Sequence, residues 1–241
     1  MRRPTVLPTL LQVAHTVRVS APTVFDAALG RSSRDRVDAR LRSWSSAGVR
    51  VTGMQVRVRG TEHVAHDRTY VVMSNHQSNW DIIALYHAFP GRTLRMVAKQ
   101  EMRKLPILGR AMSDAEFVFV DRGDATRARD AIDLARRKIE DGVSVWIAPE
   151  GTRSKDGVLG TFKKGGFHLA LSTGTTILPC TVDGTRHVSP PGDFRSRTGV
   201  PVEVRFHAPI DPKAYGDARR EALIADVRAA IASGLPSHLR T

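Results

Sequence analysis

One histidine and one aspartate in the first half of the chain have the spacing of a general-base pair. His76 and Asp81 lie in the segment Asn75-His76-Gln77-Ser78-Asn79-Trp80-Asp81, which follows a short apolar run ending at Met73. A histidine accepts a proton near neutral pH, and a carboxylate partner fixes its tautomer and stabilises the imidazolium. If a helix begins near Ser78, Asp81 lies in its first turn and can reach back to His76. The spacing alone also fits a turn histidine followed by an ordinary helix cap.

A second segment combines a carboxylate, a glycine and an arginine at the end of another apolar run. This segment is Pro149-Glu150-Gly151-Thr152-Arg153-Ser154. The guanidinium of Arg153 matches the geometry of phosphate oxygens, and Gly151 lets the backbone come close to a ligand. Glu150 can orient the arginine or a substrate hydroxyl. We therefore predict an anion-binding loop, with a surface loop and its ion pair as the plainer alternative.

Three further basic residues can add positive charge near these two segments. Lys163 lies in the glycine-rich stretch 160–166, and Lys99 and Arg122 follow two predicted strands. Each of them singly also fits a solvated surface residue. The lysine that would complete a Walker A loop is absent, so the sequence does not support nucleotide hydrolysis.

Several other chemistries are excluded by what the sequence lacks. It contains no G-x-S-x-G nucleophile elbow, no H-E-x-x-H zinc pair and no G-x-G-x-x-G fingerprint. Cys180 is the single cysteine, so neither an intrachain disulfide nor a cysteine-based metal cluster can form. We expect no metal and a reducing, cytoplasmic setting.

The net charge of +13 suits a polyanionic partner such as anionic lipid, a phosphorylated substrate or nucleic acid. The chain has 30 arginines but only 7 lysines, a bias that is also typical of a GC-rich genome. Aromatic residues make up only 6%, and no zinc finger or base-stacking motif is present, so a nucleic-acid-binding protein is the weaker alternative.

Segments typical of strands and helices alternate after Gly48. This order predicts an α/β fold with a mixed, largely parallel central sheet flanked by helices, in which functional groups gather where strands end. The expected strands are 70–73, 94–98, 117–120, 143–148, 176–182 and 202–206, and the expected helices are 82–88, 126–140, 167–172 and 218–232.

We expect residues 1–48 to form an N-terminal helical segment and 49–241 to form the α/β domain. Three prolines in the first 30 residues predict one or two short, interrupted helices there. A basic amphipathic helix is predicted from Ser33 to Trp44, with an apolar stripe that either lies in the headgroup layer of a membrane or packs on the protein's own core. Neither a transmembrane helix nor a signal peptide is predicted, because the apolar stretches are too short or interrupted.

The order of these segments resembles the four-block signature of the glycerolipid acyltransferase family. The blocks are N-H-x-x-x-x-D, the Phe-Val run that leads to Arg122, P-E-G-T-R-S, and the Ile-Leu-Pro of 177–179, with F-K-x-G before the last. The similarity is greatest to bacterial 1-acyl-glycerol-3-phosphate acyltransferases and covers about residues 37–215.

The resemblance assigns expected roles to these residues. It implies that His76 takes the proton from the acceptor hydroxyl as that oxygen attacks an acyl thioester, without a covalent acyl-enzyme, while Asp81 orients His76. It implies that the acceptor's glycerol phosphate is bound by Arg122 and by the third block, and that Pro179 shapes the acyl-donor site. The expected substrate-binding set is Glu150, Gly151, Thr152, Arg153, Arg122, Lys99 and Lys163.

The expected partners follow from the same resemblance. The acceptor is a lysophospholipid, most simply 1-acyl-sn-glycerol-3-phosphate, and the co-substrate is acyl-CoA or acyl carrier protein (acyl-ACP), with no bound cofactor. A lyso-ornithine lipid and glycerol 3-phosphate are the alternative acceptors. Many relatives carry N-terminal transmembrane segments, whereas none is predicted here. We therefore expect peripheral attachment to an anionic membrane at its cytoplasmic face, through the basic N-terminal helices of residues 1–48. Cys180 stands where the fourth block usually has an aliphatic residue, and we expect it to pack as a small hydrophobe.

Overall fold

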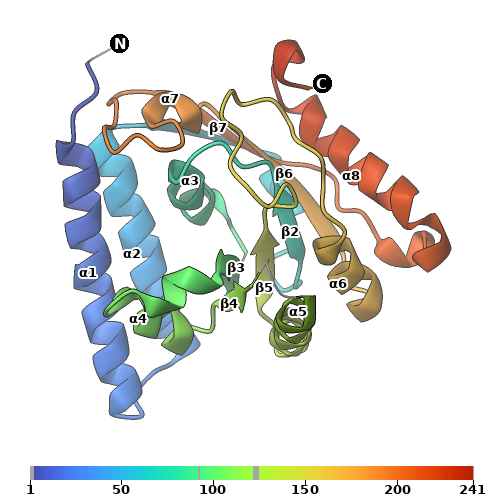
Figure 1. Cartoon of the computed structure of the whole chain (residues 1–241), viewed down its shortest axis with the longest axis horizontal. Helices are drawn as coiled ribbons and strands as arrows, with labels where there is room; N and C mark the ends of the chain where they lie inside the picture. The colour runs from blue at the N-terminus through green and yellow to red at the C-terminus, as the bar shows by residue number, and fades with distance from the viewer. Residues whose placement is uncertain (1–2, 92, 122–124, 241) are drawn as a thin grey trace.

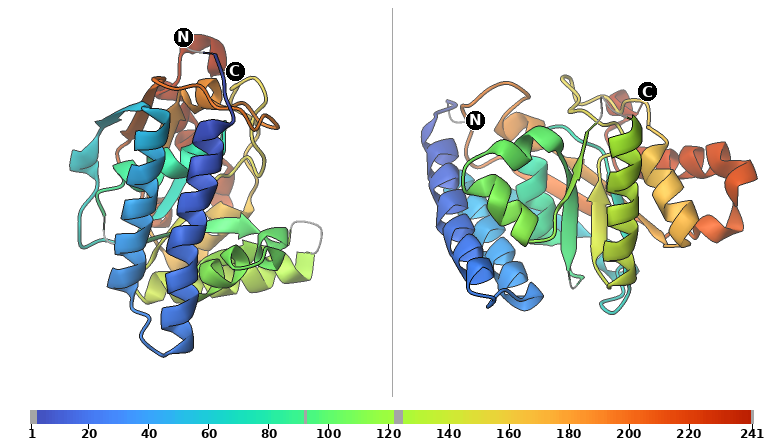
Figure 2. Two further views of the ribbon diagram at one scale, coloured as in Figure 1. Left: turned by 90° about the vertical axis from the view of Figure 1, so that its left-hand side faces the viewer. Right: turned by 60° about the horizontal axis from the view of Figure 1, so that its bottom comes forward.

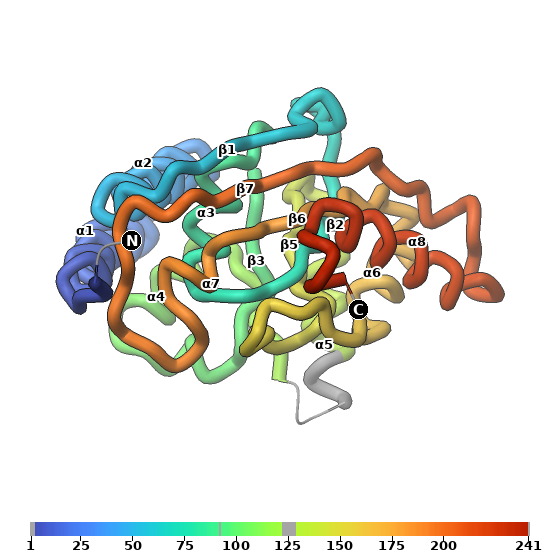
Figure 3. The backbone as a smooth tube through the Cα atoms, turned by 90° about the horizontal axis from the view of Figure 1, so that it is seen from above, coloured from blue at the N-terminus to red at the C-terminus, as the bar shows by residue number. Residues whose placement is uncertain are grey.

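The computed structural model describes residues 3–91, 93–121 and 125–240. In this part of the chain, strands form one sheet in the order β1-β7-β6-β2-β5-β3-β4 (Figure 1, and from above in Figure 3). Neighbouring strands are parallel except β6 and β7, which confirms the predicted mixed, largely parallel sheet. The strands are β1 (Gln55–Arg59), β2 (Val71–Ser74), β3 (Leu94–Lys99), β4 (Val118–Val120), β5 (Ser144–Ile147), β6 (Ile177–Asp183) and β7 (Pro201–Phe206).

Helices bury the inner strands of the sheet on both faces, and successive side chains of a strand point to opposite faces. In β2, Val72 packs in one core cluster, and Val71 and Met73 pack in another. Helices cover the two faces (Figure 2). The first cluster includes residues of α2 (Arg34–Thr52), α3 (Trp80–Ala88) and α4 (Leu108–Asp114), and the second includes residues of α5 (Ala125–Glu140), α6 (Gly165–Thr173) and α8 (Arg220–Ser233).

The first helix differs from the expected short, interrupted pieces. Instead, α1 is one continuous helix from Leu7 to Ala28, so that prediction was wrong. Pro8 lies in the first turn, where a missing N–H costs nothing, and Pro22 lies inside the helix. The long packing of α1 against α2 and α4 offsets the backbone hydrogen bond that Pro22 cannot make.

The second helix, α2, is longer than predicted and runs on to Thr52. The Ser33 side chain caps its start by accepting from the Arg36 N–H, and Gly53, with φ +58°, ends it. The expected domain boundary after residue 48 therefore falls inside α2, while the division into two domains stays a prediction. Of the two alternatives for its apolar stripe, the core alternative holds: Val37 is buried, and Leu41 and Trp44 pack against the same cluster.

The chain enters the sheet through an edge strand, β1, that the alternating pattern did not predict. Its side chains are mostly exposed, so its sequence lacks the apolar run that marks the inner strands. No helix in the described part of the chain combines the length and apolar character needed to cross a bilayer.

Candidate active site

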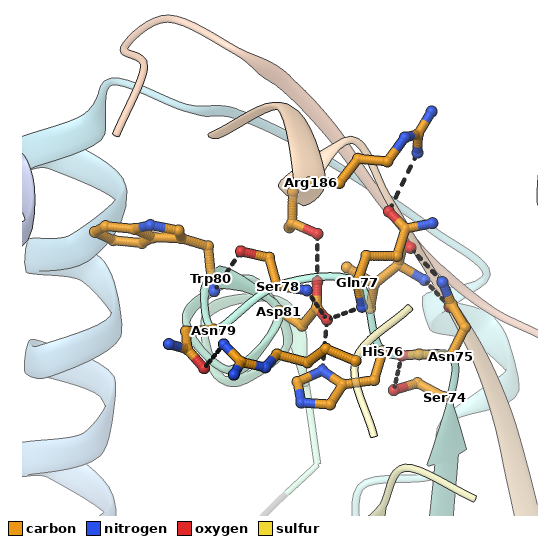
Figure 4. A network of polar contacts seen from close by, with 12 residues as sticks. Ser74, Asn75, His76, Gln77, Ser78, Asn79, Trp80, Asp81 and Arg186 are labelled. Atoms are coloured by element: carbon orange, nitrogen blue, oxygen red, sulfur yellow. Dashed lines mark hydrogen bonds and ion pairs between the residues drawn. The ribbon is translucent and has the colours of Figure 1, made fainter. Parts of the chain in front are cut away.

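The loop that carries His76 is fixed between two neighbouring strands. It follows β2, where Asn75 donates from Nδ2 to the Val182 carbonyl and accepts from the Val182 N–H at Oδ1, both at 2.8 Å. The Asn75 amide thus continues the β2–β6 pairing beyond the end of β2. The chain then turns into α3, so His76 lies at the carboxyl edge of the sheet (Figure 4).

His76 and Asp81 form the contact that their spacing predicted. The His76 Nδ1 and Asp81 Oδ2 atoms are 2.7 Å apart, and the Asp81 side chain is fully buried in the first turn of α3. An ionised carboxylate only accepts hydrogen bonds, so Nδ1 carries the proton and Nε2 is left to accept one. The His76 side chain keeps 19% of its surface exposed, which leaves the ring accessible from the solvent side.

The Asp81 carboxylate is held by donors from its own loop and from a distant one. Its Oδ2 atom also accepts from the backbone N–H groups of Gln77 at 2.6 Å and Ser78 at 2.9 Å, as the converging dashed lines in Figure 4 show. Its Oδ1 atom accepts from the Thr185 hydroxyl, at the start of α7 (Thr185–Val188). Sequence reasoning missed Thr185, because nothing in its local pattern marks a partner of Asp81.

A tryptophan ring packs against the imidazole of His76. The rings of His76 and Trp146 meet edge to face with centroids 6.3 Å apart, and Trp146 Nε1 donates to the Ser74 hydroxyl at 2.9 Å. Trp146 lies in β5, next to β2 in the sheet. The aromatic ring therefore limits the movement of His76 on that side.

The loop after β5 is joined to the His76 loop by backbone and side-chain contacts. The Ser154 N–H donates to the His76 carbonyl at 2.8 Å. Glu150 accepts from the His76 N–H through Oε1 at 2.8 Å and from the Gly160 N–H through Oε2 at 2.9 Å. The structure therefore brings the two predicted segments together at one edge of the sheet.

Glu150 is a buried carboxylate whose pKa is raised. Burial is the main cause, and the N–H donors from Gly160 and His76 oppose it by stabilising the charged form. Because both oxygens serve backbone amides, the Glu150 carboxylate in this structure holds the loops rather than reaching out to Arg153.

Arg153 lies beside the start of α3, half-buried. Its Nη1 atom donates to Asn79 Oδ1 at 3.0 Å, and Asn79 is the residue just before α3. This partner is an uncharged amide, so the contact leaves the positive charge of the guanidinium unneutralised. A phosphate at this position would meet a cation already held close to His76.

The other predicted site residues differ in how close they lie to the Glu150–Arg153 loop. Gly151 has φ +72°, and a Cβ there would lie 3.0 Å from the Lys163 side chain, so Lys163 lies over this glycine. Thr152 is exposed in the same loop, and Lys99 is exposed at the end of β3. Arg122 lies outside the described residues.

Two residues of the fourth block lie within β6. Pro179 and Cys180 are buried, and Pro179 is paired in register with Met73. Burial raises the pKa of the Cys180 thiol, which makes it a poor nucleophile and confirms that it packs as a small apolar residue. Across the described residues, no group of three or more His, Cys, Asp or Glu is placed to hold a metal ion.

A comparison with protein-family models assigns this fold and its candidate site to one class of protein. The family model described as "Acyltransferase" matches residues 55–183, which is more than half of the chain. The chain belongs to this acyltransferase family, which confirms the expected enzyme class and disfavours the nucleic-acid-binding alternative.

Within the family, the chain is similar to proteins named for one acceptor. It is 32% identical to mouse (Mus musculus) 1-acyl-sn-glycerol-3-phosphate acyltransferase alpha, over 76% of this chain and 67% of that protein. It is 36% identical to the chloroplastic 1-acyl-sn-glycerol-3-phosphate acyltransferase LPAT1 of Arabidopsis thaliana, over 65% of this chain and 44% of that protein. The chain thus spans about two thirds of the mouse relative and less than half of the plant one.

A solved structure extends the similarity to almost the whole chain. The crystal structure of the 1-acyl-sn-glycerophosphate acyltransferase PlsC from Thermotoga maritima matches with a TM-score of 0.80 and 28% identity, covering 95% of this chain and 94% of that one. The match includes most of the region before residue 37, which the sequence blocks do not reach.

Proposed function

We propose that this protein transfers an acyl group from an acyl thioester to the free hydroxyl of 1-acyl-sn-glycerol-3-phosphate, giving phosphatidic acid. The observation that carries the proposal is the His76–Asp81 pair, joined by backbone contacts to the loop that bears Arg153. The names of the mouse, plant and Thermotoga relatives support this choice of acceptor.

In the proposed reaction, His76 Nε2 takes the proton of the acceptor hydroxyl while that oxygen forms a bond to the thioester carbonyl carbon. The developing imidazolium is stabilised by Asp81, whose carboxylate accepts from Nδ1–H. When the C–S bond breaks, the leaving thiolate takes the proton back from Nε2, and His76 is neutral again. A thioester is already activated, so proton transfer and positioning suffice and no acyl-enzyme is formed.

The acceptor's phosphate is bound by Arg153 in this proposal, with Lys163 lying over Gly151 in the same loop region. Lys99, Thr152 and Arg122 complete the proposed substrate-binding set. Acyl-CoA and acyl-ACP both present a thioester, and both are proposed donors. Glu150 and Gly151 belong to the same proposed set, and Glu150 shapes the site by holding the His76 loop against the loop that carries Arg153.

We further propose that the protein lies on an anionic membrane through α1. The helix exposes a stripe of large apolar side chains, among them Leu7, Leu10, Val17 and Phe25, each 49–62% exposed. Arg18 is also exposed on this helix. An apolar stripe of this kind suits the boundary between headgroups and acyl chains, with arginines contacting anionic lipid.

The first prediction tests the base. His76→Ala should lower turnover by at least roughly 10²–10⁴-fold, the contribution typical of general-base catalysis, and Asp81→Asn should also be severely impaired because the imidazole loses its acceptor at Nδ1. The measurement is product formation from labelled acyl-CoA and 1-acyl-sn-glycerol-3-phosphate, separated by chromatography. Circular dichroism checks the fold. Near-normal turnover by folded His76→Ala protein would refute the mechanism.

The second prediction tests the acceptor. Arg153→Ala should raise the KM for 1-acyl-sn-glycerol-3-phosphate by roughly 10-fold or more, with the KM for the thioester little changed. Arg195→Ala is the matched control, since that arginine is exposed and already paired with Asp193. If wild type and Arg153→Ala acylate a lyso-ornithine lipid equally well, and better than the phosphate acceptor, the assigned acceptor is wrong.

A further inference from the structure

The two oxygens of the Asp81 carboxylate are held very differently. Oδ2 accepts from three N–H groups, those of the His76 ring, Gln77 and Ser78, all from the residues just before Asp81. Oδ1 accepts from the hydroxyl of Thr185, which lies 104 residues further along the chain. In the described part of the chain, this hydroxyl is the one hydrogen-bond donor to Oδ1. The orientation of the Asp81 carboxylate therefore depends on one distant side chain.

Thr185 is itself held firmly in place. It is fully buried, and it follows Gly184, where the chain leaves β6 with φ +96° and where a Cβ would lie 2.4 Å from the Pro201 carbonyl oxygen. Only glycine fits this turn. The short helix α7 that begins with Thr185 packs against α3. The tight turn at Gly184 thus fixes the backbone of Thr185 so that its hydroxyl faces Asp81.

We infer that Thr185 is a positioning residue for the His76 base. A buried carboxylate oxygen that loses its donor destabilises the anion, here even though the three N–H donors to Oδ2 remain. Without the Thr185 hydroxyl, Oδ1 is no longer held, and the plane of the Asp81 carboxylate can turn so that Oδ2 no longer faces His76. This rotation deprives Nδ1 of its acceptor and lowers the fraction of His76 in the reactive tautomer. This inference rests on the proposed function, in which His76 is the base.

The predicted effect is on turnover and not on substrate binding. Thr185→Val keeps the shape and removes the donor, so kcat should fall roughly 10- to 100-fold while the KM values for both substrates stay within about twofold. Thr185→Ser restores the donor and should recover kcat to within about threefold of wild type. If Thr185→Val fails to fold, the comparison of Thr185→Ser with Thr185→Cys replaces it, because a thiol is only a weak donor.

Thr181→Val is the matched control. Thr181 is also buried, and its hydroxyl donates to the Ile231 carbonyl at 2.7 Å, away from the His76–Asp81 pair. The same chemical change there should lower thermal stability and leave kcat near the wild-type value. A general loss of packing is thereby separated from a loss of the Asp81 donor.

A spectroscopic readout makes the test independent of turnover. In protein labelled with ¹⁵N-histidine, the His76 Nδ1 proton should give a downfield resonance, assigned by its loss in His76→Ala. This resonance should shift or broaden in Thr185→Val and persist in Thr181→Val. Wild-type kcat and an unchanged resonance in Thr185→Val, with His76→Ala inactive, would overturn the role of Thr185 alone. Activity in folded His76→Ala protein would instead overturn the proposed function.

Discussion

At the scale of single residues, the carboxylate of Glu150, a predicted substrate-binding residue, holds two loops of the site together. Its two oxygens accept from the backbone N–H groups of His76 and Gly160, which belong to different loops. A Cβ on residue 160 would lie 3.0 Å from Glu150 Oε2, so only a residue without a side chain fits easily there. We infer that Glu150 acts on the reaction mainly through the position of His76.

The prediction at this scale is that Glu150→Gln weakens activity through the loop. A glutamine offers one acceptor oxygen, and its NH₂ group would face a backbone N–H, so we expect kcat to fall roughly 10-fold with retained folding. Asp156→Asn, an exposed carboxylate of the same region that also accepts a backbone N–H, is the control and should stay within about twofold. Equal kcat in wild type and Glu150→Gln would argue against this role.

At the scale of elements, a charged cluster joins three helical regions around Glu116. This glutamate follows α4 and accepts from Arg34 at the start of α2 at 2.8 and 3.0 Å, and from Lys138 near the end of α5 at 2.8 Å. The hydrogen bond from Arg34 is the main cause that lowers the Glu116 pKa to about 2, with Lys138 adding to it. The cluster therefore joins the start of α2 to the end of α4 and to α5.

The sign of its pH dependence follows from that lowered pKa. Because the folded-state pKa lies below the ordinary value of 4.5, Glu116 stabilises the fold at higher pH, and this contribution is lost as pH falls toward about 2. Glu116→Gln should therefore lower the free energy of unfolding by about 1–2 kcal/mol at pH 7. This difference between wild type and variant should narrow below pH 4.5. Urea unfolding at a series of pH values measures this. Glu62→Gln, on an exposed turn, is the control, and a gap that does not change with pH would contradict the assignment.

At the scale of the whole molecule, the two N-terminal helices lie side by side on the side of the sheet that α3 and α4 cover (Figures 1 and 2). The sequence pattern drew attention to the 33–44 stripe, which packs against the core, whereas most of the exposed large apolar side chains among the described residues lie on or directly beside α1. The proposed membrane contact is therefore placed on α1 and not on α2.

We predict that Leu10→Asp combined with Phe25→Asp weakens binding to vesicles that contain anionic lipid, because both side chains are about 60% exposed on α1. Co-sedimentation with vesicles measures the bound fraction, which should fall severalfold with little change in thermal stability. Val58→Asp, on the exposed edge strand β1, adds a similar charge elsewhere and should bind nearly as wild type. Unchanged binding of the α1 variant would remove the helix from the proposed surface.

Local spacing determined the part of the site that lies within one turn of chain. His76 and Asp81 are five residues apart, so a local turn from a loop into a helix is enough to bring the two side chains within reach of each other. The order of strands and helices likewise predicted a largely parallel sheet, because buried parallel strands have continuous apolar runs. The strand β1 escaped prediction because an exposed edge lacks such a run.

Only the tertiary structure decided which distant groups complete the site. The contacts of His76 with Glu150 and of Asp81 with Thr185 join residues 74 and 104 positions apart, and strand order alone brings them together. The same holds for the N-terminal helices: a helix pattern shows that an apolar stripe exists, but the neighbours of that helix determine whether the stripe is covered. Long-range contacts depend on topology, and a local pattern of residue types does not contain that information.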